Sequence, residues 1–365
     1  MTAGGGARAR VAPRRVALLL AALGIVVLAG QIAIGTSRGL HFAPHELLRG
    51  LAAMLGLREP LASGQALLEL RVWSALTSAG VGACLSVAGA LLQGLLRNPL
   101  ADPSLLGVTS GASLGAALAL LALGGFAKTL VGASLSDAGP WIVTLAALIG
   151  ALAVTGLVVL LGQRLAQRGG LAMLVLLGVA INSCIAGALA ALQDVLWTNQ
   201  QLDTLQALQA WSMGTLAERK PYHVALVALG IAVAAVIVPR VARELDLLAS
   251  GDDDARSVGV NVERVRALVV VAAAVTTACA VAAAGQIGFV GLVVPQVVRL
   301  TTGSSHRTLL GLSLLAGAVF VPGVDLAQVL VADARVLRPN VLMSLLGGPF
   351  FLALLVAYGR RRVTW

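Results

Sequence analysis

AGALLQGLLRNPLADPSLLGVTSGASLGA, residues 88–116, joins two apolar segments through a short polar turn. In the turn, Asn98 and Asp102 each precede a proline, and a residue before proline favours extended backbone, so the chain reverses here between two helices. Asp102 or Ser104 is a candidate cap for the second helix. In that helix glycine recurs at every fourth position, namely at Gly107, Gly111 and Gly115. Three glycines on one helical face predict close packing against another helix in lipid.

The composition predicts a protein of the lipid bilayer. Of the 365 residues, 58% are hydrophobic and 12% are charged, about half the charged share of a soluble domain. An ordinary soluble enzyme is excluded, because most of the chain lacks a polar face. Ten apolar stretches run over residues 16–35, 72–96, 104–123, 142–161, 171–192, 223–238, 265–284, 287–300, 309–331 and 341–358. The expected fold is therefore all-α: one transmembrane domain over residues 1–365, a bundle of about ten helices.

Basic residues predict the orientation of the chain, since short cytoplasmic loops retain Lys and Arg. With both termini inside, the basic tail of residues 1–15, the connection 239–266 and the triple arginine at 360–362 all face the cytoplasm. An odd number of spans would place that arginine tail outside. We expect a multi-pass protein of the bacterial inner membrane.

The two halves of the chain resemble each other weakly. SVAGALLQGLLRNPL (86–100) and AAAGQIGFVGLVVPQVVRL (282–300) are both glycine-interrupted helices that end in an arginine-bearing cytoplasmic loop. If helices 2–5 correspond to helices 7–10, the offset of five spans makes the repeat inverted. Inverted repeats are common in transporters.

The longest cytoplasmic connection, PRVARELDLLASGDDDARSVGVNVERVR (239–266), combines charge with two short helical patterns. Ser250 or Asp252 is expected to cap a short helix that ends at Gly259. The loop is either a solvated connector or a docking surface for a cytoplasmic subunit. The sequence has no GxxxxGK[ST] phosphate loop, so any ATP that drives this protein binds another chain.

Three polar residues suggest other functions. Ser113 lies in a GxSxG pattern, but within an apolar helical run, which favours a packing ridge over a nucleophile. His306 has no acidic residue close to it in sequence; with Ser113 it leaves an intramembrane enzyme as an alternative. Asp325 is a charge in an apolar stretch. It either lines an aqueous path, pairs with Arg335 or Arg338, or lies near an interface, and it is the candidate centre of an ion-coupled carrier. No metal-ligand or disulfide spacing is present, so no bound metal is expected.

Taken together, several motifs resemble the permease subunits of iron-siderophore, haem and cobalamin ABC importers, the FecCD-type family. The resemblance covers roughly residues 71–358. It rests on residues 88–116 together with LVLLGVAIN (174–182), WSMGTL (211–216), SGDDDARSVGVNVERVR (250–266), GQIGFVGLVVPQVVRL (285–300), GSSHRTLL (303–310) and LLGGPFFLALL (345–355).

The resemblance implies a homodimeric permease, not an enzyme, that imports a metal chelate, a ferric siderophore foremost and haem or cobalamin as alternatives. It implies separate ATPase subunits that hold ATP and Mg²⁺, and a periplasmic binding protein that delivers the substrate; the permease itself would bind no cofactor. The ATPase-docking residues would be Gly251, Asp254, Ala255, Arg256, Gly259 and Val260. The cytoplasmic turn would comprise Arg97, Asn98, Pro99 and Asp102. Leu171 and Ala172 would belong to a gate, with helices 5 and 10 along the path, and Arg71 would contact the binding protein.

The chain also departs from the family pattern. An RLPR element before helix 2 appears as Arg71-Val72-Trp73-Ser74, so only its first arginine remains. Gln286 replaces a proline, Gln296 replaces a histidine, and Gln328 replaces an arginine of an ADTLAR-like stretch. These departures indicate a divergent substrate class or altered contacts with the partners.

Overall fold

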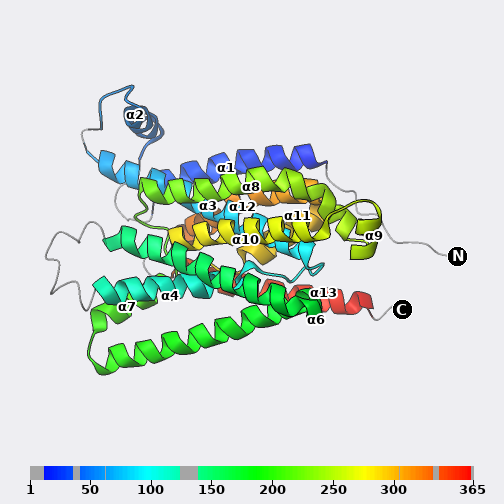
Figure 1. Cartoon of the computed structure of the whole chain (residues 1–365). Helices are drawn as coiled ribbons and strands as arrows, with labels where there is room; N and C mark the ends of the chain where they lie inside the picture. Colours follow the sequence, from blue (N-terminus) through cyan, green and yellow to red (C-terminus); the bar gives the residue numbers. More distant parts are fainter. Residues whose placement is uncertain are drawn as a thin grey trace.

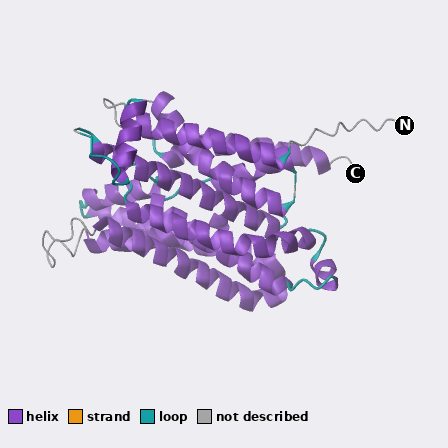
Figure 2. Ribbon diagram, turned by 90° about the horizontal axis from the view of Figure 1, so that it is seen from above, coloured by secondary structure: helices purple, strands orange, loops and turns teal. Residues whose placement is uncertain are grey.

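The computed structural model describes residues 12–35, 42–61, 63–123, 139–303, 305–331 and 337–362, without the side chains of 163, 165–172, 174, 331 and 357–362. Every element in these residues is a helix, and the long helices run along a common axis (Figures 1 and 2). The elements are α1 (Pro13–Ile34), α2 (Pro44–Met54), α3 (Gln65–Leu95), η1 (Pro103–Leu106), α4 (Val108–Leu121), α6 (Gly139–Thr198), α7 (Leu202–Ser212), α8 (Pro221–Leu248), α9 (Asp252–Ser257), α10 (Val262–Ala284), α11 (Val290–Thr302), α12 (His306–Val331) and α13 (Pro339–Arg362).

The ten predicted apolar stretches are all helical. Eight helical segments of the described chain are long and apolar enough to cross a membrane, and α4 and α11 are two shorter apolar helices. The fourth and fifth stretches both belong to α6, which crosses the bundle and returns (Figure 1). We call Gly139–Gly162 its first arm and Val175–Thr198 its second arm. No loop separates the two arms, since the residues between them are helical as well.

Small residues let the helices pack backbone to backbone. α3 is the central helix, packed against α8, α10, α11 and α12. A Cβ atom added at Gly89 would lie 1.8 Å from the carbonyl oxygen of Gly291 in α11. The glycine face predicted for the third span is confirmed: a Cβ at Gly115 would lie 2.0 Å from the carbonyl oxygen of Ala146, in the first arm of α6.

The order of elements supports the predicted inverted repeat. In each half a long helix is followed by a short one, α4 or α11, and then by two further spans. Each short helix begins after a residue with left-handed backbone, Gly107 (φ 79°) or Phe289 (φ 65°). α3 runs toward the end of the bundle that carries α9, and α10 runs away from it, so the two halves are antiparallel (Figure 1). Residues 1–11 of the basic tail lie outside the described residues.

Candidate functional site

α9 is a six-residue helix held between the end of α8 and the start of α10. Its N-cap is Gly251, at φ 139°, and no side chain caps it. The predicted cap by Ser250 or Asp252 is therefore wrong. The Ser250 hydroxyl instead donates to the carbonyl of Leu247 at 2.8 Å. The predicted end is confirmed, because Gly259 adopts φ 88° and its N–H bonds the carbonyl of Arg256 at 3.0 Å.

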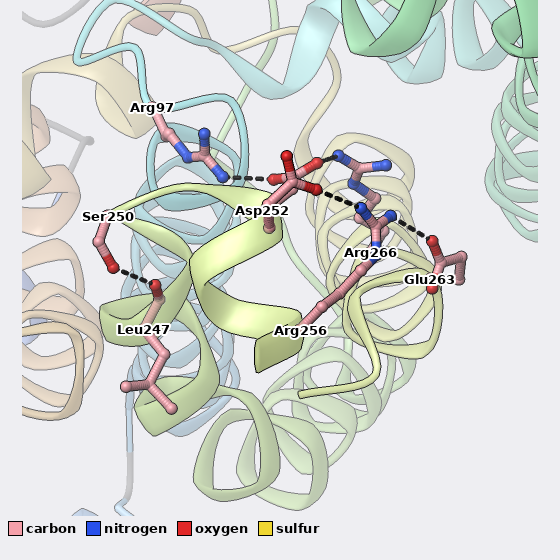
Figure 3. A network of polar contacts seen from close by, with 8 residues as sticks. Arg97, Leu247, Ser250, Asp252, Arg256, Glu263 and Arg266 are labelled. Carbon is pink, nitrogen blue, oxygen red and sulfur yellow. Dashed lines mark hydrogen bonds and ion pairs between the residues drawn. The ribbon is translucent and has the colours of Figure 1, made fainter. Parts of the chain in front are cut away.

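The Asp252 carboxylate is the centre of a network that the motif did not identify (Figure 3). One of its oxygens accepts from Arg97, just after α3, and the other accepts from Arg266 in α10. The predicted cytoplasmic turn and the predicted docking loop are thus joined directly. A carboxylate shared by two guanidinium groups is a charge-assisted link, so α9, α3 and α10 are held together at this end.

The outward face of α9 is charged and uncovered within the described chain. Ala255 is buried, at 1% exposure, and fixes the inner side of the helix. The Arg256 side chain bonds Glu263 at 2.7 Å, and this hydrogen bond raises the pKa of Arg256. Val258 is 64% exposed, and a Cβ atom added at Gly259 would meet nothing within 4 Å. A charged rim around an exposed apolar residue is a surface that a partner protein can cover.

The cytoplasmic turn is organised by its own side chains. The Asn98 side chain accepts the N–H of Leu100 at 3.0 Å. Asp102 accepts the N–H of Ser104 at 2.9 Å and caps the short helix η1. The predicted cap therefore acts one element earlier than expected, because α4 itself begins after Gly107 without a side-chain cap. Asp102 also lines a cavity of about 480 Å³ with Gln286 and Asn340.

His306 has an acidic partner that its sequence neighbourhood did not reveal. Its Nδ1 atom lies 2.6 Å from Asp246 near the end of α8, and its backbone N–H donates to the same carboxylate oxygen at 2.9 Å. Ser113 is buried elsewhere, where its hydroxyl donates to the Thr109 carbonyl at 2.9 Å and contacts the side-chain amide of Gln286. The described structure does not join Ser113 and His306 as a nucleophile and its base.

Two charged residues at the end of the bundle opposite α9 form hydrogen bonds within the chain. Arg71 is 5% exposed and donates to the carbonyls of Ile32 and Ala33 at the end of α1, at 3.2 and 2.9 Å. Its contact with a binding protein stays a prediction. Asp325 accepts from Gln31 at 2.6 Å and borders a cavity of about 140 Å³.

The neighbours of Asp325 bear on two of its alternatives. It is buried, at 9% exposure, and its partner Gln31 lies in the last turn of α1, so the alternative near an interface of the membrane stays a prediction. Arg338 donates instead to the carbonyl of Ala210 at 3.4 Å, and Arg335 lies outside the described residues.

Each residue that departs from the family pattern either forms a hydrogen bond or is buried in the described structure. Ser74 accepts the backbone N–H of Arg219 at 3.1 Å. Gln286 ties the loop after α10 to α4 through Ser113. Gln328 donates to the carbonyl of Leu337 just before α13, and Gln296 is fully buried on α11.

Two of the three least buried apolar helices of the described chain lie beside the predicted path; the third is α1, with 11% of its window buried. Leu171 and Ala172 lie within α6, between its two arms, and their side chains are outside the description. Only 6% of the apolar window in the second arm is buried, and 17% of the window in α13. These two helices correspond to predicted helices 5 and 10.

The comparisons with known proteins identify the family. The profile of the FecCD transport family matches residues 17–357. This chain belongs to the FecCD transport family. A relative from Yersinia pestis, the hemin transport system permease protein HmuU, is 37% identical over 81% of this chain and 84% of its own length. The cobalamin import system permease protein BtuC of Halobacterium salinarum is 38% identical over 76% and 69%, and the Fe(3+) dicitrate transport system permease protein FecD of Escherichia coli is 36% identical over 80% and 85%.

A solved structure supports the fold of this FecCD member. It is described as an inward-facing conformation of a metal-chelate type ABC transporter, with a TM-score of 0.74 and 25% identity over 94% of this chain and 99% of its own. The chain is therefore a multi-pass permease of the ABC importer class and not an enzyme. An importer permease of this class works with a separate ATPase subunit.

Proposed function

We propose that this chain imports a metal chelate, a ferric siderophore foremost, from the periplasm to the cytoplasm. The family match over residues 17–357 carries the proposal. The relatives named for hemin, cobalamin and Fe(3+) dicitrate support a bulky metal complex as the substrate class. Uptake of labelled ferric chelate, haem and cobalamin into vesicles would distinguish them, and uptake of only haem or only cobalamin would contradict the siderophore assignment.

The exposed face of α9 is the proposed docking surface for a cytoplasmic ATPase. ATPase closure would displace α9, and the Asp252 carboxylate would transmit the displacement to α3 through Arg97 and to α10 through Arg266. Such coupling requires that the ATPase bind two states of the permease with different affinity. This assignment places α9, the start of α1 and the end of α13 in the cytoplasm, at one end of the bundle (Figure 1).

A second copy of the chain is the proposed cover for the second arm of α6 and for α13. Their exposed apolar side chains include Leu176, Trp197, Leu345 and Leu352, each more than half exposed. A path between two copies would be bordered by these helices, with the gate at Leu171 and Ala172 near the α9 end. The small and apolar residues of such a path suit a large substrate better than a single ion.

The docking surface is tested by filling its open glycine position. Gly259→Trp should abolish ATP-driven uptake of ferric chelate in proteoliposomes that also contain the ATPase and the binding protein, because the new side chain occupies the space in front of α9. Arg256→Glu should weaken uptake by reversing the charge of the rim. Gly56→Trp is the matched control: Gly56 also has positive φ (71°) and open space, in the loop after α2. Normal coupled uptake by both α9 variants would contradict the docking assignment.

The transmission step is tested at Asp252. Asp252→Ala removes the shared carboxylate, so ATP hydrolysis should continue while uptake falls severalfold. The control is Asp253→Ala, whose carboxylate is fully exposed and pairs only with Arg256 at 3.3 Å. Equal effects of the two variants would mean that the Asp252 network transmits nothing.

The ion-coupled alternative predicts a different dependence. Transport that persists without the ATPase, follows a proton gradient and is lost in Asp325→Asn would favour a carrier centred on Asp325. The importer proposal expects no uptake without ATP.

A further inference from the structure

A cavity of about 880 Å³ lies at the end of the bundle opposite α9. It is bordered by the first turns of α6 and α8 and the last turn of α10. Its polar lining comprises Thr144, Thr215, Glu218, Arg219, Lys220, Tyr222 and His223, and apolar residues such as Leu70, Leu120 and Trp211 complete the wall. Glu218 is the one carboxylate of this lining; it is exposed, and its charge acts on Arg219 without a hydrogen bond between the two in the described chain. Neither the sequence motifs nor the proposed coupling assign any role to it.

Arg219 brings an inward-facing cation to this cavity. Its Nη1 atom donates to the carbonyl of Ala283 at 2.9 Å, and its backbone N–H is fixed by the Ser74 hydroxyl. Its Nε atom is buried and has no hydrogen-bond partner among the described residues. Burial lowers the pKa of Arg219 to about 10, so the side chain is charged at neutral pH.

The ring of His223 brings a second donor close to Arg219, with its Nε2 atom 3.3 Å from Arg219 Nη1. The Nδ1 atom of His223 accepts the backbone N–H of Lys220 at 3.1 Å, which places the proton of the neutral ring on Nε2. That Nε2 atom is the one that lies 3.3 Å from Arg219 Nη1. Two N–H donors therefore point at the same space, and neither supplies an acceptor for the other.

The neighbouring aromatic pair adds a third unsatisfied group. Tyr222 stacks on Trp141 with ring centroids 4.0 Å apart, and its buried hydroxyl has no hydrogen-bond partner in the part of the chain that the structure describes. Arg219 and His223 thus bring donors and no acceptor to this space, and the Tyr222 hydroxyl beside them can donate or accept. Buried donors of this kind cost free energy unless an acceptor reaches them.

We propose that this cavity binds an oxyanion, a carboxylate or a phosphate, with Arg219 and His223 as its donors. An oxyanion offers only acceptors, and the guanidinium fork matches two oxygens of one group. The stacked rings and the apolar wall would contact the body that carries the oxyanion.

Two sources supply this chemistry. One is the phosphate of an anionic phospholipid, since Trp141 is 53% exposed and aromatic and basic residues concentrate at membrane interfaces. The other is a carboxylate of the transported chelate, and this source rests on the proposed function.

Binding to the full purified chain tests the site. One arm measures equilibrium dialysis of radiolabelled citrate with the permease in phosphatidylcholine nanodiscs. The other arm compares retention of phosphatidylglycerol and phosphatidylcholine by native mass spectrometry. In whichever of the two assays the wild type shows binding, Arg219→Gln should weaken that binding by about tenfold or more, because it removes a charge-assisted contact. The matched control is Arg58→Gln, an exposed arginine in the loop between α2 and α3, and it should bind like the wild type.

A second variant separates binding from folding. Arg219→Gln also removes the bond to Ala283, whereas His223→Phe keeps that bond and removes the Nε2 donor together with the Nδ1 acceptor of the Lys220 N–H; it should still weaken binding severalfold. Citrate binding alone identifies the cargo as the source, and phosphatidylglycerol binding alone identifies the lipid. No binding by the wild type in either arm, or equal binding by both variants and the wild type, overturns the site. Neither assay includes the ATPase or the binding protein. The binding result therefore does not depend on whether the chain imports a chelate, and the two proposals can fail separately.

Discussion

α3 and the second arm of α6 are both apolar helices long enough to span a bilayer, yet 89% of the apolar window of α3 is buried and only 6% of that of the second arm. The buried helix is the more polar one: Arg71, Ser78 and Gln93 all lie inside the bundle. The second arm instead exposes Leu176, Val179 and Val195. Within a membrane protein, hydrophobicity does not drive a helix to the centre, because lipid solvates apolar side chains equally well. Small and polar residues mark the centre, and exposed apolar residues mark contact with lipid or with a second copy.

The largest expected effect is at a glycine of α3. Gly89→Leu should prevent correct folding, or destabilise the chain by more than ~3 kcal/mol, because its Cβ atom would lie 1.8 Å from a backbone oxygen that cannot move without displacing α11. Recovery of monodisperse protein and thermal unfolding in micelles would measure the loss.

The matched variant is Gly187→Leu in the second arm of α6, where an added Cβ atom meets nothing within 4 Å. Its subunit should unfold at the temperature of the wild type. If a second copy covers this arm, the same variant should shift the protein from dimer to monomer. Equal loss of folding by both variants would contradict the interpretation that α3 is packed on all sides and the second arm of α6 is not.

The sequence predicts the features that depend on residues close together in the chain. Ten apolar stretches, the turn at Asp102 and the glycine face of α4 follow from composition and spacing, since each depends on residues within one or two helical turns. The links between distant segments do not follow: Asp252 bonds Arg97, and His306 bonds Asp246, across 155 and 60 residues. The run of three aspartates at 252–254 is a signal of charge, but nothing in it distinguishes Asp252, which is partly buried and bonds two arginines, from its exposed neighbours. Likewise, the bond that fixes the Arg219 side chain to the carbonyl of Ala283 spans 64 residues.

A smaller difference in stability is expected between a variant that removes a buried hydrogen bond and one that removes an exposed hydrogen bond. Pro295 lacks an N–H, so the carbonyl of Gly291 has no helical donor in α11. Gln93 of α3 supplies one, with its Nε2 atom 3.1 Å from that carbonyl oxygen. Gln93→Leu should therefore destabilise the chain by ~1 kcal/mol, typical of a buried bond between membrane helices. Ser183→Ala in the second arm removes only an exposed bond to the Val179 carbonyl and should change little.

A double-variant cycle identifies the cause of that loss. In Pro295→Ala the restored N–H can satisfy the Gly291 carbonyl from within α11, so Gln93→Leu should cost less in this background than in the wild type. Thermal or denaturant unfolding of the four proteins in the same micelle measures the coupling. An unchanged cost would show that Gln93 acts through packing volume alone. A reduced cost would show that the polar residues inside α3 satisfy backbone groups that its neighbours leave open, which the second arm of α6, with few buried neighbours, does not need to do.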